Sequence, residues 1–183
     1  DHIRKVIAAI EPHDSAARFE KLGVKVVPGA AKFRDAKTLE SGGSIFSAKR
    51  IVIATGSRPA VPAIPGLETV AYFTNETIFE NSVLPKHLII IGGGAIGMEL
   101  AQAHRRLGSA VTVIEAFTPL AKDDPELAAV VLESLRRDGV RIFAETAIKK
   151  ISKAKPGIAI ETAGHGKITG SHLLVATGRA ANV

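Results

Sequence analysis

The feature that most constrains the fold is a glycine loop between an apolar run and a helix. The run His87–Ile91 leads directly into the loop Gly92–Gly97, and helical spacing follows over Ala95–Leu107. A second apolar run over Ala110–Ile114 ends at Glu115. Uninterrupted apolar runs are typical of parallel strands that are covered on both faces. The order strand, loop, helix, strand therefore predicts a doubly wound α/β fold with a parallel, Rossmann-like sheet.

The glycine spacing in this loop predicts dinucleotide binding. Gly92 permits the tight turn, Gly94 lets the backbone approach a pyrophosphate, and Gly97 brings the helix close to the strand. The free N–H groups and the positive end of the helix dipole then face the diphosphate. The alternative is that the glycines serve only the packing of strand against helix.

The acid at the end of the second run distinguishes between two nicotinamide cofactors. A carboxylate at Glu115 can accept hydrogen bonds from both hydroxyls of an adenosine ribose. It would repel a 2′-phosphate, no arginine lies in 116–119, and Lys122 is the first cation that follows. The sequence therefore favours NAD(H) over NADP(H). The alternative for Glu115 is a solvated acid at a strand end.

Two halves of the chain share an order of elements. Each contains an aliphatic helix, then short strands, then an Ala-Thr-Gly tripeptide, at 54–56 and again at 176–178. This repeat predicts two nucleotide-binding units, of which the first lacks its glycine loop and is followed by a proline-rich linker. Chance recurrence of the tripeptide is the alternative.

Local signals predict the remaining elements. A helix from Ile3 is expected to break at Pro12, to be capped again at Asp14 or Ser15, and to end at Gly23. Short strands are expected at 24–27, 31–33, 45–46 and 50–54. In the second half, we expect a short helix that begins at Thr74 or Asn75, a helix that Asp124 caps, a third strand over 140–143, and a strand meander after Phe143.

Composition excludes several function classes. The 183 residues are 46% hydrophobic but only 4% aromatic, so the core is expected to be aliphatic. The net charge of +6 arises from scattered basic pairs with few aromatics among them, which argues against nucleic-acid binding. There is no cysteine, and the six histidines lack metal-ligand spacing. No apolar run reaches the roughly 20 residues of a membrane span, so a cytoplasmic protein without membrane partners is expected.

Four segments together resemble the pyridine nucleotide-disulfide oxidoreductases. They occur in that family's order and span nearly the whole chain, and the acid at Glu115 makes the dihydrolipoamide dehydrogenase-like branch the closer match. The four segments are Val52–Pro59, Ile89–Glu99, Val111–Glu115 and Leu174–Arg179.

The resemblance implies the later part of an FAD-binding domain with its linker over residues 1–68, an NAD(H)-binding domain over residues 69–183, and hence two cofactor sites. NAD(H) would contact the loop and the start of its helix, with Ile148 and Gly178 bordering the nucleotide; the full set is Gly92, Gly93, Gly94, Ala95, Ile96, Gly97, Met98, Glu99, Glu115, Ile148 and Gly178. FAD would contact the turn Thr55, Gly56 and Ser57, and its adenine the backbone of Ala31. The alternatives are an exposed helix carboxylate for Glu99, strand packing for Ile148 and a strand-end turn for Gly178.

The resemblance also implies an FAD-dependent NAD(H) oxidoreductase whose other parts lie outside this sequence. A flavin glycine loop and a redox-active cysteine pair would precede residue 1. An interface domain with a His-Glu pair, through which a homodimer forms, would follow residue 183. The chain is thus expected to be inactive alone and to hold neither catalytic residues nor metal ligands. Ala95 stands where several relatives carry a tyrosine over the flavin ring.

Three alternatives stay open at this point. The parent could be a flavin-dependent NADH oxidase or diaphorase without a redox disulfide, or the chain could be a non-catalytic NADH-binding module. An S-adenosylmethionine methyltransferase also uses a glycine loop and a strand-end acid. The two Ala-Thr-Gly blocks and the strand meander after Phe143 favour the flavoprotein family over the methyltransferase.

Overall fold

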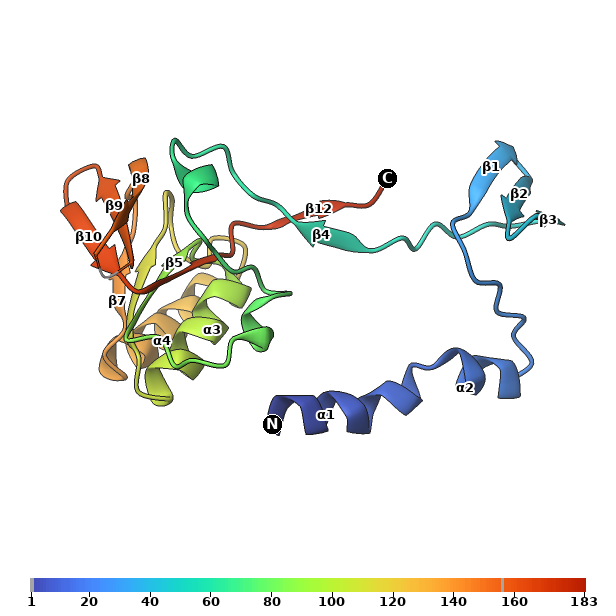
Figure 1. Ribbon diagram of the computed structural model, residues 1–183, viewed down its shortest axis with the longest axis horizontal. Coiled ribbons are helices and arrows are strands. Elements are labelled where there is room, and N and C mark those ends of the chain that lie inside the picture. Colours follow the sequence, from blue (N-terminus) through green and yellow to red (C-terminus); the bar gives the residue numbers. More distant parts are fainter. Residues whose placement is uncertain (1, 156) are drawn as a thin grey trace. The chain divides into compact units, whose positions relative to one another are not determined.

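The computed structural model describes residues 2–155 and 157–183 and divides into two compact units (Figure 1). The first unit ends at Ala54, and the second is Thr55–Val183. The division at residue 68 into two cofactor domains stays a prediction.

The first unit consists of two helices and a small antiparallel sheet. Its elements are α1 (His2–Ile10), the 3₁₀ turn η1 (Glu11–His13), α2 (Ala16–Lys21), β1 (Lys32–Asp35), β2 (Thr38–Ser41) and β3 (Ser44–Ser47), with the strands paired in the order β1-β2-β3. Pro12 ends α1, and the Ser15 hydroxyl caps α2 by accepting a hydrogen bond from the Arg18 N–H at 3.3 Å. The predicted break and new cap are confirmed.

Two of the strands predicted in the first unit are wrong. Residues 24–27 and 50–54 pair with no strand among the described residues, although both segments are rich in β-branched side chains. Val52 is 86% exposed and Ile53 is 64% exposed. Intrinsic preference for strand is not sufficient, because a strand forms only where a neighbour accepts and donates its hydrogen bonds.

The second unit is built on a parallel sheet of four strands in the order β11-β5-β6-β7. These strands are β5 (His87–Ile91), β6 (Ala110–Ile114), β7 (Arg141–Phe143) and β11 (His172–Val175), and each neighbouring pair is parallel. The predicted Rossmann-like α/β class is confirmed.

Layers cover both faces of this sheet (Figure 1). Leu88 and Ile90 point to the face that α3 (Ala95–Arg106) and α4 (Pro125–Arg137) cover. Ile89 and Ile91 point to the other face, against the antiparallel strands β8 (Ile148–Ala154), β9 (Gly157–Thr162) and β10 (Gly166–Gly170). Because alternate residues face opposite layers, an uninterrupted apolar run is what this sheet requires.

The signals at the ends of α4 act as predicted. The Asp124 carboxylate accepts hydrogen bonds from the Glu126 N–H at 2.9 Å and the Leu127 N–H at 3.3 Å, and Pro125 occupies the first turn. Gly139 adopts a φ of +89° just after the helix ends. The predicted helix near Thr74 is the single 3₁₀ turn η3 (Ile78–Glu80), and another such turn, η2 (Leu67–Thr69), lies before it.

A two-stranded antiparallel ribbon joins the two Ala-Thr-Gly blocks. β4 (Ser57–Pro59) pairs with β12 (Arg179–Ala181). The proline-rich segment that follows β4 belongs to the second unit by its contacts, because the Pro65 carbonyl accepts a hydrogen bond from the Ile151 N–H at 2.8 Å. Throughout residues 2–155 and 157–183, no helix combines the length and apolarity needed to cross a bilayer.

Candidate dinucleotide site

The glycine loop between β5 and α3 is held tightly against the sheet. Gly92 has a φ of +108°, and a Cβ there would lie 2.4 Å from the Ala176 carbonyl oxygen. A Cβ on Gly97 would lie 2.1 Å from the Gly92 carbonyl oxygen. Both contacts are too short for any side chain, so backbone packing at the end of β5 requires glycine at these two positions.

Gly94 faces open space instead. It is the N-cap of α3, and a Cβ there would meet no atom within 4 Å. The first hydrogen bond at this end of α3 runs from the Met98 N–H to the Gly94 carbonyl at 3.0 Å, so the N–H groups before it are outside the helical ladder. Free N–H groups beside an uncovered glycine form the cradle that a diphosphate requires.

The Glu115 carboxylate lies directly beside this loop. Its Oε2 accepts a hydrogen bond from the Gly93 N–H at 2.5 Å, and its Oε1 accepts one from the Phe117 N–H at 2.9 Å. The Gly93 carbonyl in turn accepts a hydrogen bond from the Leu120 N–H at 2.9 Å. The acid predicted to bind a ribose is therefore next to the predicted diphosphate cradle, and the same acid restrains the loop.

The residues that follow the loop differ in what they can offer a ligand. Met98 is 2% exposed and packs in the core beneath the helices, and Ile96 also packs against that core, so neither side chain is free for a ligand. Ala95 and Glu99 are exposed and line a groove of about 450 Å³ between α3 and α4. Of these four positions, Glu99 is the one that presents a polar side chain.

Two further candidates lie at different places in the second unit. Gly178 follows β11, has a φ of +132° and is exposed, with open space where a Cβ would be. It follows Ala176, whose carbonyl lies against Gly92, so it shares the carboxyl edge of the sheet with the glycine loop. Ile148 begins β8 and packs against the core beneath the meander, which is the packing role considered above for this residue.

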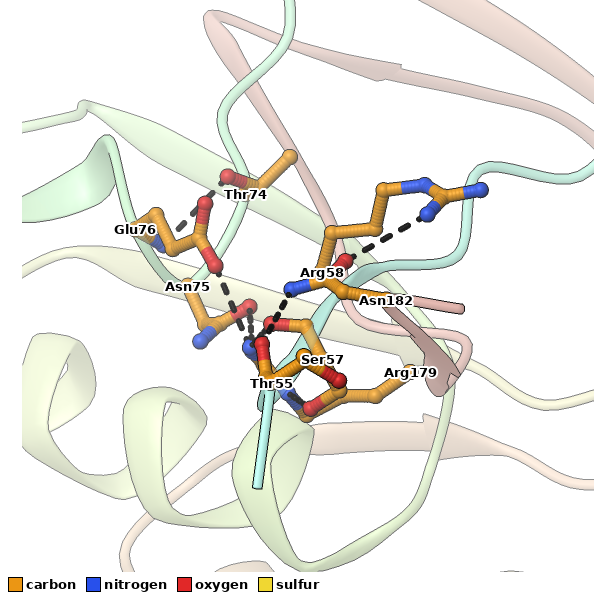
Figure 2. Close-up of polar contacts among 8 residues, drawn as sticks. All are labelled: Thr55, Ser57, Arg58, Thr74, Asn75, Glu76, Arg179 and Asn182. Atoms are coloured by element: carbon orange, nitrogen blue, oxygen red, sulfur yellow. Dashed lines mark hydrogen bonds and ion pairs between the residues drawn. The ribbon is translucent and has the colours of Figure 1, made fainter. Parts of the chain in front are cut away.

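The predicted flavin-contact turn lies in the ribbon (Figure 2). Gly56 has a φ of +71°, and its carbonyl accepts a hydrogen bond from the Asn182 N–H at 3.1 Å. The Asn182 side-chain amide donates to the Thr55 carbonyl at 3.1 Å. Ala31, the fourth flavin candidate, is an exposed residue of the first unit, just before β1.

One residue that the sequence reasoning missed is Arg179. Its Nε donates to the Ser57 hydroxyl at 2.7 Å, and its other nitrogens donate to Asn75 Oδ1 at 3.3 Å and Glu76 Oε1 at 3.2 Å (Figure 2). A signal was present in the repeat itself, because each Ala-Thr-Gly block is followed within two residues by an arginine, Arg58 in the first case.

At the opposite, amino edge of the sheet, His87 contacts a threonine and an arginine. His87 Nε2 lies 2.9 Å from the buried Thr112 hydroxyl and 3.4 Å from an Arg141 nitrogen. Partial burial lowers the pKa of His87, and the positive charge of Arg141 lowers it further. Within the described ranges, no three His, Asp or Glu side chains form a group that could hold a metal ion.

Comparison with known proteins agrees with this geometry. A family model described as pyridine nucleotide-disulphide oxidoreductase matches residues 5–183. A mercuric reductase of Shigella flexneri is 35% identical over 167 residues, which are 87% of this chain and 30% of that protein.

Two solved structures are similar as well. The HOCl-induced flavoprotein disulfide reductase RclA from Escherichia coli matches with a TM-score of 0.73 and 31% identity, covering 86% of this chain and 37% of its own. LpdA from Mycobacterium tuberculosis matches with a TM-score of 0.83 and 26% identity, covering 99% of this chain and 42% of its own. The chain thus spans 30–42% of the length of these relatives. The glycine loop, its acid and the paired Ala-Thr-Gly blocks are those of a member of the pyridine nucleotide-disulphide oxidoreductase family, to which this chain belongs.

Proposed function

We propose that the chain is the NAD(H)-binding portion of an FAD-dependent oxidoreductase that passes hydride between NAD(H) and FAD. The observation that carries this proposal is the Glu115 carboxylate, which lies against the Gly93 N–H at the mouth of the glycine loop. A dinucleotide whose diphosphate rests over Gly94 would bring its adenosine ribose to this acid.

The same acid supports NAD(H) over NADP(H). A 2′-phosphate would approach a carboxylate that is already fixed by two backbone N–H groups. Residues 116–119 contain no cation to compensate the repulsion. NADPH is therefore expected to bind more weakly than NADH.

Residues of the ribbon support a flavin beside the nicotinamide. The turn at Thr55, Gly56 and Ser57 is exposed or half-buried backbone with one positive φ, which suits close approach of a cofactor. Ala31 is proposed to contact the flavin's adenine through its backbone. The flavin, when bound, would supply the hydride acceptor or donor, while these residues supply orientation.

The parts outside this chain complete the proposal. We infer a redox-active disulfide in an upstream segment, because the relatives include a mercuric reductase and a flavoprotein disulfide reductase. A dihydrolipoamide dehydrogenase-like specificity, a homodimer formed through a downstream domain and a cytoplasmic location belong to the same proposal. A flavin NADH oxidase or diaphorase without the disulfide is the second candidate.

The complete product of the gene tests the proposal. It is expected to purify with bound flavin, whose absorbance bleaches when NADH is added without oxygen and bleaches more slowly with NADPH. Labelling of thiols after NADH reduction is expected to reveal two additional free cysteines. No bleaching would overturn the proposed function, and bleaching without new thiols would favour the oxidase or diaphorase.

In parallel, the 183-residue chain is titrated with NADH and with S-adenosylmethionine. Preference for the latter would favour the methyltransferase.

A further inference from the structure

The ribbon β4–β12 is short and largely unsupported by the core. Its ladder pairs Ser57 with Ala181, and it is extended by a hydrogen bond from the Ala60 N–H to the Gly178 carbonyl at 2.9 Å and by the bond between Asn182 and Gly56. An isolated two-stranded ribbon is marginally stable in water. Another contact is therefore needed to fix the direction of the ribbon relative to the parallel sheet β11-β5-β6-β7.

Arg179 supplies that contact through a single guanidinium. Its Nε donates to the Ser57 hydroxyl, its Nη1 donates to Asn75 Oδ1, and its Nη2 donates both to the Ser57 carbonyl and to Glu76 Oε1 (Figure 2). A rigid planar fork can satisfy acceptors on two segments at once, whereas a lysine ammonium is a point charge on a flexible stem. Arg179 therefore links two segments of the chain besides its own strand.

The segment at 74–76 is itself anchored to the sheet. The Phe73 N–H donates to the Leu173 carbonyl at 2.8 Å, and the Phe73 carbonyl accepts from the Val175 N–H at 2.8 Å, so this segment continues from the edge of β11. A chain of contacts thus runs from β11 through Asn75 and Glu76 to Arg179 and on to Ser57.

The hydrogen bonds of Arg179 restrain the ribbon more than its ion pair with Glu76 does. The Arg179 side chain is 32% exposed and that of Glu76 is 53% exposed, so their charge attraction is largely screened by water. The geometric constraint remains, because two segments share one rigid group. What Arg179 fixes is the position of the turn at Thr55–Ser57.

We propose that Arg179 is a positioning residue, which holds the flavin-contact turn at a fixed place relative to the nicotinamide-binding edge of the sheet. The proposal rests on the proposed function, in which that turn contacts FAD and Gly178 borders the nicotinamide. Hydride transfer depends steeply on the separation and angle of the reacting atoms. Loss of Arg179 would therefore slow transfer while leaving the NADH site at 92–115 intact.

The first test uses the 183-residue chain and needs no flavin. In Arg179→Gln, hydrogen exchange of the Ala60 and Asn182 amides is expected to accelerate about tenfold, since the ribbon loses bonds from a charged group. Arg179→Lys is expected to behave like Arg179→Gln. Amides of β5 and the NADH affinity are expected to stay unchanged. The matched control is Arg58→Gln: Arg58 donates to the Ala181 carbonyl at 3.5 Å and to Asn182 Oδ1 at 3.3 Å, both on the opposite side of the ribbon, so the comparison is made at the Ala60 amide, where its effect should be smaller. Two results would show that Arg179 does not hold the ribbon in place. One is unchanged amide exchange in Arg179→Gln, and the other is equal acceleration of Ala60 exchange in Arg179→Gln and Arg58→Gln.

The second test uses the complete gene product and stopped-flow reduction of its flavin by NADH. Arg179→Gln and Arg179→Lys are expected to lower the limiting reduction rate at least about tenfold, with the NADH dissociation constant within about twofold of wild type. Wild-type rates in both variants would overturn the positioning role, and so would a parallel loss of NADH affinity. A wild-type flavin that NADH does not reduce would instead count against the proposed function, and the exchange experiment would still decide whether Arg179 clamps the ribbon.

Discussion

Glu115 serves two purposes that a single substitution pair can separate. Its carboxylate restrains the loop through the Gly93 and Phe117 N–H groups, and in the proposed function it carries the charge that would repel a 2′-phosphate. Glu115→Ala should weaken NADH binding about tenfold or more, as expected for losing bonds to a charged acceptor. Glu115→Gln keeps an acceptor for the loop and should lose less NADH affinity, yet it should raise the affinity for NADPH relative to NADH.

Fluorescence titration with NADH and with NADPH measures the affinities of Glu115→Ala and Glu115→Gln for the two cofactors. Glu133→Gln removes an equally charged, exposed side chain of α4 and serves as the control. Equal NADH affinity in the wild type and Glu115→Ala would show that the acid has no part in binding.

His87 is expected to make the stability of the second unit depend on pH. Its pKa is lowered in the folded protein, chiefly by burial, whereas an unfolded histidine has its ordinary value near 6.5. The folded state thus favours the neutral ring, and its full contribution to stability is present above about pH 6.5 and is lost as the pH falls through the folded-state pKa.

Urea unfolding at pH 7.5 and pH 5.5, followed by circular dichroism, tests this dependence. His87→Asn should show a smaller loss of unfolding free energy between the two conditions than the wild type. The pKa of His172 is also lowered, by burial and by His104. The unfolding free energy of His87→Asn should therefore still fall somewhat between pH 7.5 and pH 5.5. Replacement of the exposed His13 should change nothing, and an identical pH dependence in His87→Asn would contradict the prediction.

At the scale of elements, the glycine loop separates folding from binding. A Cβ on Gly97 would collide with the Gly92 carbonyl at 2.1 Å, so Gly97→Ala should push α3 from β5 and cost about 1–3 kcal/mol of stability. A Cβ on Gly94 meets nothing, so Gly94→Ala should fold with wild-type stability and obstruct only the diphosphate.

Thermal unfolding and NADH titration distinguish the two variants. Gly97→Ala should lower both the melting temperature and the affinity, and Gly94→Ala the affinity alone. If Gly94→Ala bound NADH as tightly as the wild type, the diphosphate would have to lie elsewhere.

The cap of α4 gives a prediction that concerns stability alone. Asp124 satisfies the Glu126 and Leu127 N–H groups, and Asp124→Ala should cost about 1 kcal/mol, or roughly 4 °C in melting temperature for a unit of this size. Calorimetry measures the shift, with Asp123→Ala as the neighbouring control. An equal shift in both variants would assign the effect to charge rather than to the cap.

Elements with local signals could be predicted from sequence, and elements that depend on distant partners could not. Caps, glycine stops and periodicity identify α3, α4 and β5, since their determinants lie within a few residues. The ribbon β4–β12 was missed because its strands are short, lack an apolar pattern and pair residues that lie 120–124 positions apart in the sequence. Residues 50–54 were overpredicted for the converse reason, since they have apolar side chains but no partner strand.

The same division applies to the candidate site. The proximity of Gly92, Gly97 and Glu115 could be predicted because the loop and its acid belong to one local supersecondary unit. The roles of Arg179 and Asn75 could not be inferred, because they depend on where the chain returns after the whole sheet has formed.

For the molecule as a whole, the second unit carries the buried core. Both apolar clusters are built from residues of Thr55–Val183, whereas α1 and α2 bury none of their residues. A protein of residues 55–183 should therefore unfold cooperatively and bind NADH within about twofold of the full chain. Thermal unfolding and titration of the shorter protein measure this. Aggregation, or a loss of affinity beyond about fivefold, would show that the first unit is required.

The strand order β11-β5-β6-β7 has a kinetic consequence. The loop, its acid and both helices are translated before β11, yet β11 forms one flank of the central strand β5. A nascent chain that stops before His172 leaves β5 with an unpaired edge and Leu88–Ile91 without one lateral neighbour. Closure of the sheet is thus a late, long-range event during synthesis, and protection of the exposed edge by chaperones matters most in that interval.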